Sequence, residues 1–193
     1  MGRAKGAIVR PMVEWFAGAC GELALRDLAS ALSPAVRDEV AIDAPALGLL
    51  MAGWYSEALA SELAEMIVKR GLAVTGDQNV IRMLGTRIVD RTLGRISRAA
   101  VEWLASPFTI ARSAPVFWRM YHDRGEVKAR VEGSSIVAVC SGWVPHGQAW
   151  CRVVGSSAVH VLALSGCKDA RLWVHRCSGG RGDCSMVLRW SPD

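Results

Sequence analysis

The stretch EVKARVE, residues 126–132, decides the fold of this chain. Valine and alanine alternate in it with glutamate, lysine and arginine, and a period of two is typical of a strand with one buried face. The turn signal Asp123-Arg124-Gly125 comes directly before it. The sequence therefore predicts that helices give way to a sheet at this point.

Three more strands and a helix are predicted after this first strand. Residues 136–140 are apolar on both faces, which favours a central strand, and residues 148–164 have apolar side chains at helical spacing. Residues 170–177 and 185–190 are the last two strands, joined by the glycine-rich segment 178–183. The predicted order of this part is strand, strand, helix, strand, strand.

The residues before this sheet are predicted to be helical, with apolar periodicity in residues 11–19, 23–32 and 114–121. Residues 54–70 form the clearest helix, and Glu57, Ser61 and Glu65 lie off its apolar stripe. A long helix is predicted from Asp77 to Leu104, and Pro107 ends that segment. Gly85 and Gly94 lie inside the long helix, which indicates a close helix contact or a kink.

The chain is therefore predicted to be one α+β domain, residues 1–193, with a helical layer packed on an antiparallel sheet. Residues 1–122 form its helical part, and residues 123–193 form its sheet part. A chain of 193 residues with 51% hydrophobic and 21% charged residues fits one globular core.

The charge and hydropathy patterns argue against two classes of partner. The net charge is +5, but the basic residues are scattered among acidic ones, so nucleic acid is not expected. No apolar stretch reaches the roughly 20 residues that span a bilayer. The segment Ala17-Gly18-Ala19-Cys20 faintly resembles a lipoprotein cleavage box, but Glu14 interrupts the apolar run before it. We therefore expect a first helix here and a cytoplasmic protein.

Three short stretches carry a resemblance to a known family. They are KGAIV at residues 5–9, the pair Trp54-Tyr55, and the closing pattern Cys177-x6-Cys184-x5-Trp190 with Arg181-Gly182-Asp183 inside it. Together they resemble a paralogous myxobacterial family of unknown function. That family is similar to the superfold shared by 4-vinyl-reductase-type domains and haem–nitric-oxide-binding domains, although a fold alone does not specify a function.

The resemblance implies helices packed on an antiparallel sheet, dimerisation through helices, and an interior pocket for a small apolar ligand. Some vinyl-reductase-type sensors also hold a structural zinc near the final strands. Cys151, Cys177 and Cys184 fall where three zinc ligands of that pattern would lie. The position of the fourth, a carboxylate, is occupied by Val174.

His175 is a candidate to complete a zinc site with the three cysteines. Zinc favours four ligands in a tetrahedron, and strand alternation places His175 on the same face as Cys177. The alternative is that the cysteines are buried thiols, either inert or redox-active. In a reducing cytoplasm a Cys177–Cys184 disulfide is not expected.

Catalysis and haem binding are both disfavoured by the sequence. The histidines are His122, His146, His160 and His175, and no nucleophile signature surrounds any cysteine or serine. His122 and Asp123 are expected to lie in a solvated turn. The helical part before residue 120 has no histidine to act as an axial haem ligand, and the propionate-binding Tyr-x-Ser-x-Arg signature is absent.

The tryptophans are the remaining clue to function. Candidates to line a ligand pocket or an interface are Trp54, Trp103, Trp118, Trp150 and Trp173. The predicted function is a non-catalytic ligand- or protein-binding module, foremost a homodimeric adaptor in bacterial signalling or cell organisation. The alternatives are a sensor of small apolar ligands with a structural zinc site and a Cys/His-dependent enzyme. A sensor should contain an apolar cavity of roughly 300–1,000 Å³, whereas an adaptor should have a filled interior and an exposed apolar patch.

Overall fold

The computed structural model describes residues 2–76, 79–94, 99, 101, 105–177 and 183–192. Its helices are α1 (Gly6–Cys20), α2 (Glu22–Ser30), α3 (Pro34–Arg37), the 3-10 turn η1 (Pro45–Gly48), α4 (Glu57–Thr75), α5 (Val80–Thr92), α7 (Pro107–Tyr121) and α8 (Gln148–Leu164). Its strands are β1 (Arg3–Lys5), β2 (Trp54–Ser56), β3 (Glu126–Glu132), β4 (Ser135–Ser141), β5 (Arg171–Arg176) and β6 (Cys184–Arg189).

The main sheet has the order β3-β4-β6-β5, and all neighbouring strands in it are antiparallel. The apolar strand β4 is central, as its composition predicts, and Val137 is paired with both Arg130 and Val187. The prediction of a mixed helix and sheet fold with antiparallel strands is confirmed. The two-stranded sheet of β1 and β2 was not predicted, because three-residue strands leave no periodicity to detect.

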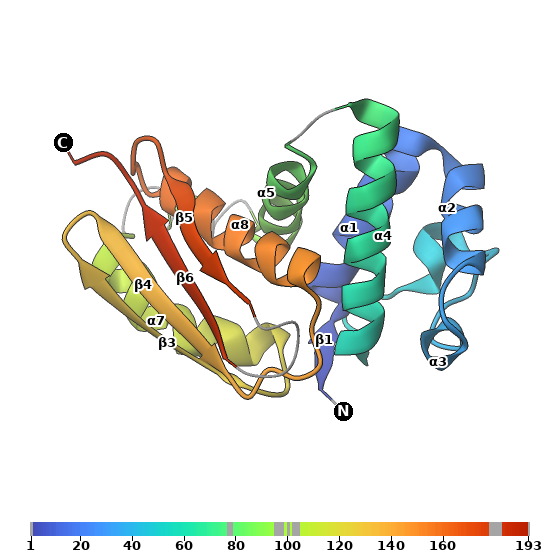
Figure 1. Ribbon diagram of the computed structural model, residues 1–193, viewed down its shortest axis with the longest axis horizontal. Helices are drawn as coiled ribbons and strands as arrows, with labels where there is room; N and C mark the ends of the chain where they lie inside the picture. The colour runs from blue at the N-terminus through green and yellow to red at the C-terminus, as the bar shows by residue number, and fades with distance from the viewer. Residues whose placement is uncertain are drawn as a thin grey trace.

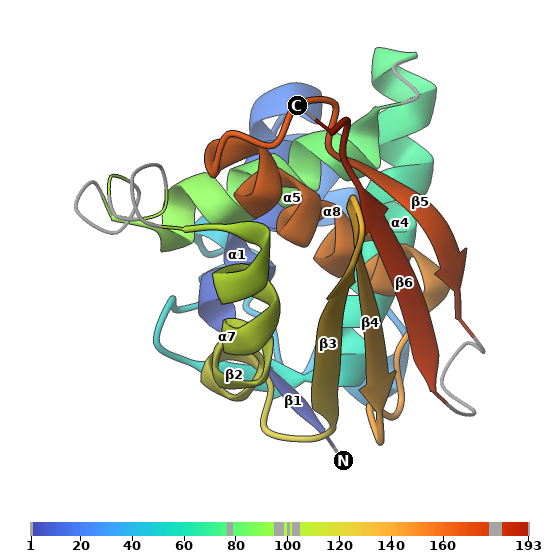
Figure 2. The ribbon, with the colours of Figure 1, turned by 90° about the vertical axis from the view of Figure 1, so that its left-hand side faces the viewer.

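The helices form layers on one side of the main sheet (Figures 1 and 2). Helix α8 packs on β5 and β6, and α5 packs on α8. Helices α1 and α4 lie beyond them, with α2 and α3 at the far end of the molecule (Figure 1). Helix α7 packs along β3. Among the described residues, no helix is both long enough and apolar enough to cross a membrane.

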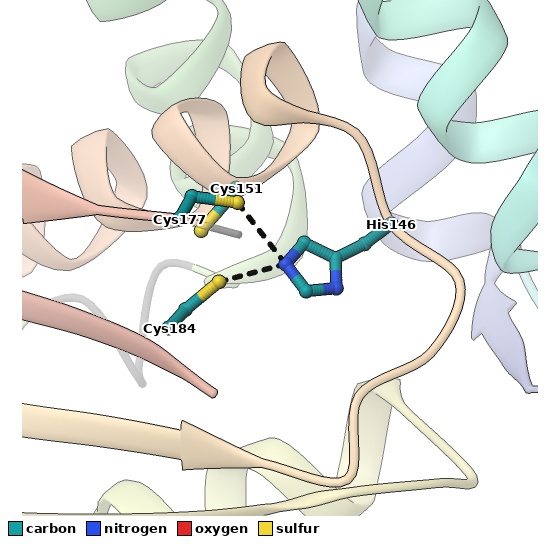
Figure 3. A group of neighbouring side chains, drawn as sticks. All are labelled: His146, Cys151, Cys177 and Cys184. Carbon is teal, nitrogen blue, oxygen red and sulfur yellow. Dashed lines mark hydrogen bonds between the residues drawn. The ribbon is translucent and has the colours of Figure 1, made fainter. Parts of the chain in front are cut away.

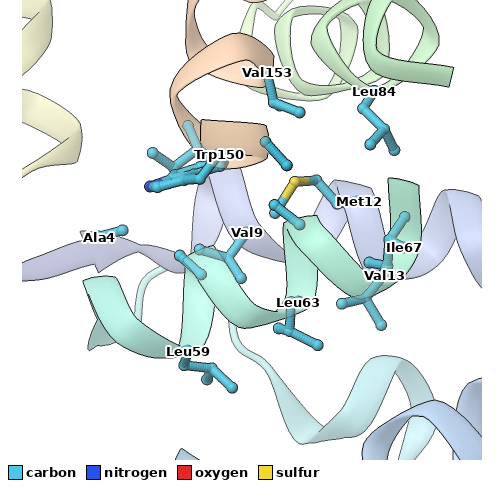
Figure 4. Packing of buried hydrophobic residues seen from close by; sticks show 14 of the residues in the cluster. Ala4, Val9, Met12, Val13, Leu59, Leu63, Ile67, Leu84, Trp150 and Val153 are labelled. Atoms are coloured by element: carbon cyan, nitrogen blue, oxygen red, sulfur yellow. The ribbon is translucent and has the colours of Figure 1, made fainter. Parts of the chain in front are cut away.

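The largest core fills the space between α1, α4, α5 and α8 (Figure 4). Leu59, Leu63 and Ile67 repeat every four residues along α4, so they form one buried stripe. Trp150 enters the same core from α8, and Met12 enters it from α1. A second, smaller cluster lies between the sheet and the end of α8, around Leu162 and Leu188. Helix α8 thus contributes to both cores.

The predicted helix from Asp77 to Leu104 is wrong. Helix α5 ends at Thr92, and Leu93 has an extended backbone (ψ 109°) that stops the hydrogen-bonded ladder. Gly94 therefore lies beyond the helix, whereas Gly85 is inside it. A β carbon on Gly85 would come within 2.7 Å of the backbone of Ser156, so this glycine lets α5 and α8 approach closely.

Three proline and tryptophan positions also differ from expectation. Helix α1 begins at Gly6, five residues before Pro11, which lies inside the helix. Pro107 begins helix α7 instead of ending a segment, because Ser106 and Thr109 form a capping box there. Trp54 lies in strand β2, and helix α4 begins only after Ser56, whose hydroxyl accepts a hydrogen bond from the backbone of Leu59.

Candidate functional site

Four side chains that can bind a metal meet between α8 and the last hairpin (Figure 3). Cys151 is in the first turn of α8, Cys177 directly follows β5, and Cys184 begins β6. His146 comes from the segment that connects β4 to α8. The three sulfur atoms and one ring nitrogen all lie within 4.8 Å of one another.

His146 is oriented by contacts on the opposite side of its ring. Its Nδ1 donates a hydrogen bond to the carbonyl of Trp143, and the two rings are stacked with centroids 4.1 Å apart. This leaves Nε2 directed at the sulfurs, 2.7 Å from Cys184 Sγ and 3.2 Å from Cys177 Sγ. A backbone carbonyl that fixes the tautomer of a histidine is the usual support of a metal ligand.

The protonation of the cluster suits cation binding. A hydrogen bond from the Cys151 thiol, together with one from His146, lowers the pKa of Cys184 to about 4. The same contact with Cys184 and burial both raise the pKa of Cys151. Burial opposes a charge on His146, but the hydrogen bond and negative charge of Cys184 raise its pKa. The low pKa of Cys184 favours a thiolate at this position, and a thiolate is the form of cysteine that binds a metal ion.

The structure brings Cys151, Cys177 and Cys184 together, but His146 and not His175 is the fourth member of the group. His175 contacts the cluster from β5, with Nε2 3.1 Å from Cys151 Sγ. Strand alternation placed His175 on the correct side of the sheet, but the four ligand atoms that lie within 4.8 Å of one another are those of His146 and the three cysteines. The signal for His146 was its position five residues before Cys151, at the start of a helix.

The cluster is open to solvent on one side. Cys177 and His175 line a polar hollow of about 460 Å³ together with Gln148, Arg176 and Asp183. Cys151, Cys184 and His146 are buried. An ion therefore has a route of access past Cys177.

Helix α4 holds the start of α8 in place. Ser61 Oγ accepts a hydrogen bond from the backbone of Gly147, and Glu65 Oε1 accepts one from the backbone of Ala149, each at 2.9 Å. Helix α8 has no cap from its own N-cap residue, Gly147, so these side chains satisfy its free N–H groups. The positions that lie off the apolar stripe of α4 thus support the segment that carries Cys151.

Glu57 is the third residue of that polar row, and it is completely buried. Its Oε1 lies 2.6 Å from His122 Nδ1, and its Oε2 accepts a hydrogen bond from Trp150 Nε1 at 2.8 Å. The His122 ring stacks on Trp118 with centroids 4.0 Å apart. The expectation of a solvated His122 is wrong, because the side chain is only 4% exposed.

A cavity of about 230 Å³ lies beside this pair, between the sheet and helices α5, α7 and α8. Its walls are mostly apolar and include Ile88, Phe117, Ala138, Ala158, Met186 and Leu188. The hydroxyls of Thr92 and Ser157 donate hydrogen bonds to carbonyls of their own helices. The imidazole of His122 and the phenol of Tyr121 also lie in the wall.

The tryptophan candidates separate into two groups. Trp118 and Trp150 are buried and line the cavity. Trp54 and Trp173 do not line it, and they are 37% and 55% exposed. Trp103 lies outside the described residues.

No protein-family model matches the chain, and no curated protein matches it either. Solved structures of H-NOX domains are similar to it over almost its whole length. The Fe(II) unliganded H-NOX protein from K. algicida has a TM-score of 0.66 at 7% identity and covers 98% of this chain and 97% of its own. A mutant H-NOX from T. Tengcongensis has a TM-score of 0.56 at 8% identity, with coverages of 97% and 98%.

A third similar structure is an oxygen-binding H-NOX domain related to soluble guanylate cyclases. Its TM-score is 0.54 at 8% identity, and it covers 97% of this chain and 95% of its own. Likeness at these identities shows an H-NOX-like fold. Such a likeness does not show which ligand this chain binds.

Haem is the cofactor that this fold implies, and the cavity does not fit it. A cavity of about 150 Å³ holds one benzene ring, so 230 Å³ is too small for the four pyrroles of a porphyrin. Both Trp118 and Trp150 contribute bulk to the walls. We therefore assign no role to haem in this chain.

Proposed function

We propose that this chain is a non-catalytic module that binds a small, mainly apolar ligand between its helical and sheet parts. The observation that carries this proposal is the 230 Å³ cavity, with its apolar walls and a buried imidazole at its edge. Ligand sites are typically apolar pockets with a few polar groups that orient the ligand. The cavity is smaller than the roughly 300–1,000 Å³ expected of a sensor. The adaptor alternative predicts a filled interior, so a cavity of any such size still favours the sensor alternative.

The size and polarity of the cavity limit the ligand. A volume of 230 Å³ takes one substituted ring or an aliphatic molecule of similar bulk. Glu57 engages Nδ1 of His122, so Nε2 is the atom of that ring left to meet a ligand. A hydroxyl group suits this position because it can either donate or accept a hydrogen bond.

Titration calorimetry with toluene and p-cresol tests the proposal, because the two probes differ by one hydroxyl. We expect both to bind, with p-cresol tighter. The paired substitutions Ala138→Leu and Ala158→Leu fill the cavity and should abolish both signals. Ala73→Leu, at an exposed position of α4, is the matched control and should change neither. Binding that persists in the filled variant would contradict the proposal.

We also propose that the four-residue cluster holds a structural zinc ion. Three cysteines and one histidine form a closed ligand set for Zn²⁺, and tetrahedral bond lengths separate such ligand atoms by about 3.5–3.8 Å. The atoms of His146, Cys151, Cys177 and Cys184, all within 4.8 Å of one another, are compatible with that geometry. The ion would tie the start of α8 to the last hairpin, because Cys151 is in α8, Cys177 directly follows β5 and Cys184 begins β6.

Metal content of the purified protein, measured by native mass spectrometry and elemental analysis after incubation with zinc, tests this second proposal. We expect one zinc per chain, lost in Cys184→Ser and retained in Cys20→Ser, whose cysteine lies at the end of α1. Protein that binds no zinc while its thiols stay reduced would contradict it. The same spectra report the subunit number and so test the homodimer that the family resemblance implies.

A further inference from the structure

The outer face of the main sheet is the side turned away from the helices. Ile136, Met186 and Leu188 point inward and line the cavity, so their strand neighbours face outward. The outward residues Val137, Val187 and Val174 are consecutive partners across β4, β6 and β5, and all are half-buried. The centre of this face is therefore apolar.

One side of the outer face is basic and aromatic. Arg171 and Arg189 are direct partners across β5 and β6. Their guanidinium carbons lie 5.1 and 5.2 Å from the ring centroid of Trp173, which sits at the irregularity in β5 and is 55% exposed. Arg176 is exposed at the other end of β5. We call Arg171, Trp173, Arg176, Val187 and Arg189 the outer patch.

Two arginines that face each other across paired strands repel, which costs stability unless another group neutralises them. Among the described residues, no carboxylate lies within ion-pair distance of Arg171, Arg176 or Arg189. The basic residues of β3 on the same face differ. Lys128 and Arg130 are paired with Glu126 and Glu132, at 3.3 and 2.6 Å. Within the described part of the chain, the outer patch thus carries positive charge with no paired carboxylate, beside an apolar centre.

We propose that the outer patch binds an acidic protein surface that has apolar residues at its centre. Arginine and tryptophan are the side chains that most often dominate protein interfaces, and an apolar centre with a charged rim is their usual anatomy. A second copy of this chain is disfavoured as the occupant, because it would bring the same unpaired arginines against these. Nucleic acid is disfavoured because phosphate binding needs a concentrated positive face, whereas the centre of this face is apolar, with Val137, Val174 and Val187.

Selection of displayed random peptides against the whole protein tests this proposal. We expect enriched peptides to combine acidic with apolar residues. Their affinity should fall about tenfold or more for Trp173→Ala and for Arg171→Glu. The matched controls are Trp54→Ala, another exposed tryptophan next to basic side chains, and Arg112→Glu, an exposed arginine on α7. These controls should change the affinity less than about twofold.

The substitution Arg189→Glu gives a readout independent of peptide selection. It replaces a repulsive cross-strand pair with an attractive one, so the urea midpoint of the free protein should rise while peptide affinity falls. A variant that lost binding because it misfolded would instead show both a lower urea midpoint and a lower peptide affinity. The proposal is overturned if the enriched peptides are not acidic, if the patch variants bind them normally, or if only a fluorescent oligothymidylate binds in a patch-dependent way.

Discussion

Oε1 of Glu57 lies 2.6 Å from Nδ1 of His122, and the two side chains are 1% and 4% exposed. Glu57 is the first residue of α4, and His122 directly follows α7, so the contact joins two helices 65 residues apart in the chain. Burying a carboxylate is costly unless its oxygens are satisfied, and Trp150 satisfies the second oxygen. The pair therefore fixes the position of the imidazole at the edge of the cavity.

Glu57→Ala should destabilise the fold by roughly 3–5 kcal/mol, because it leaves His122 and Trp150 Nε1 buried without their partner. Urea unfolding followed by circular dichroism measures the loss. The control Asp27→Ala removes an exposed carboxylate of α2 and should change stability by less than about 0.5 kcal/mol. If both substitutions lowered the free energy of unfolding equally, the buried pair would contribute no more to stability than an exposed carboxylate.

Gly85→Ala should destabilise the fold by about 1–3 kcal/mol, because the new methyl group would overlap the backbone of Ser156 and Ser157 on α8. Gly18→Ala is the matched control, since a β carbon on Gly18 in α1 would meet nothing within 4 Å. This control should instead stabilise the fold by about 0.4–1 kcal/mol. A thermal melt of both variants distinguishes these outcomes, and a destabilised Gly18→Ala would contradict the reasoning.

Glu14 predicts a specific pH dependence. Burial favours its protonation, but hydrogen bonds from Arg10 and Arg91, at 2.8 and 2.9 Å, hold its pKa below the ordinary value. A lowered folded-state pKa contributes stability that is present above the unfolded-state pKa and is lost as the pH falls through the folded-state pKa. Wild type should therefore exceed Glu14→Gln by roughly 0.2–1 kcal/mol at pH 7. The difference should vanish in acid, and a gap that widened on acidification would refute the assignment.

Glu65→Ala should weaken the start of α8 by about 0.5–2 kcal/mol, because Glu65 satisfies the free N–H of Ala149 from another helix. Hydrogen exchange gives a local readout. The amide of Ala149 should exchange faster in the variant, whereas the amides of α2, at the far end of the molecule (Figure 1), should be unaffected. Faster exchange throughout the protein would mean a global effect instead.

The elements with strong local periodicity could be predicted from the sequence. The helix over residues 148–164 has the bounds of α8, and the alternating residues 126–132 form β3. Such patterns can be detected because they depend only on residues that are adjacent in the sequence. The end of the helix at Thr92 was indicated only by Gly94, as a kink, because apolar residues continue past Leu93 and the helix ends through the backbone conformation of that residue.

The candidate site was predictable only in part, because its contacts join distant segments. Three cysteines were identified, but the orientation of His146 depends on the carbonyl of Trp143 and on α4, which supports the loop. Glu57 was missed because an acid off the apolar stripe normally faces solvent. Its burial depends on His122 and Trp150, which the pattern of α4 cannot reveal.

Strand β6 joins the three regions described above. Cys184 at its start belongs to the cluster of His146 and three cysteines, Met186 and Leu188 line the cavity, and Val187 and Arg189 belong to the outer patch. A ligand that displaces Leu188 must also move the peptide groups that carry Val187 and Arg189. Occupancy of the interior can thus be transmitted to the outer surface through a single strand, and by thermodynamic reciprocity a partner bound outside would alter affinity inside.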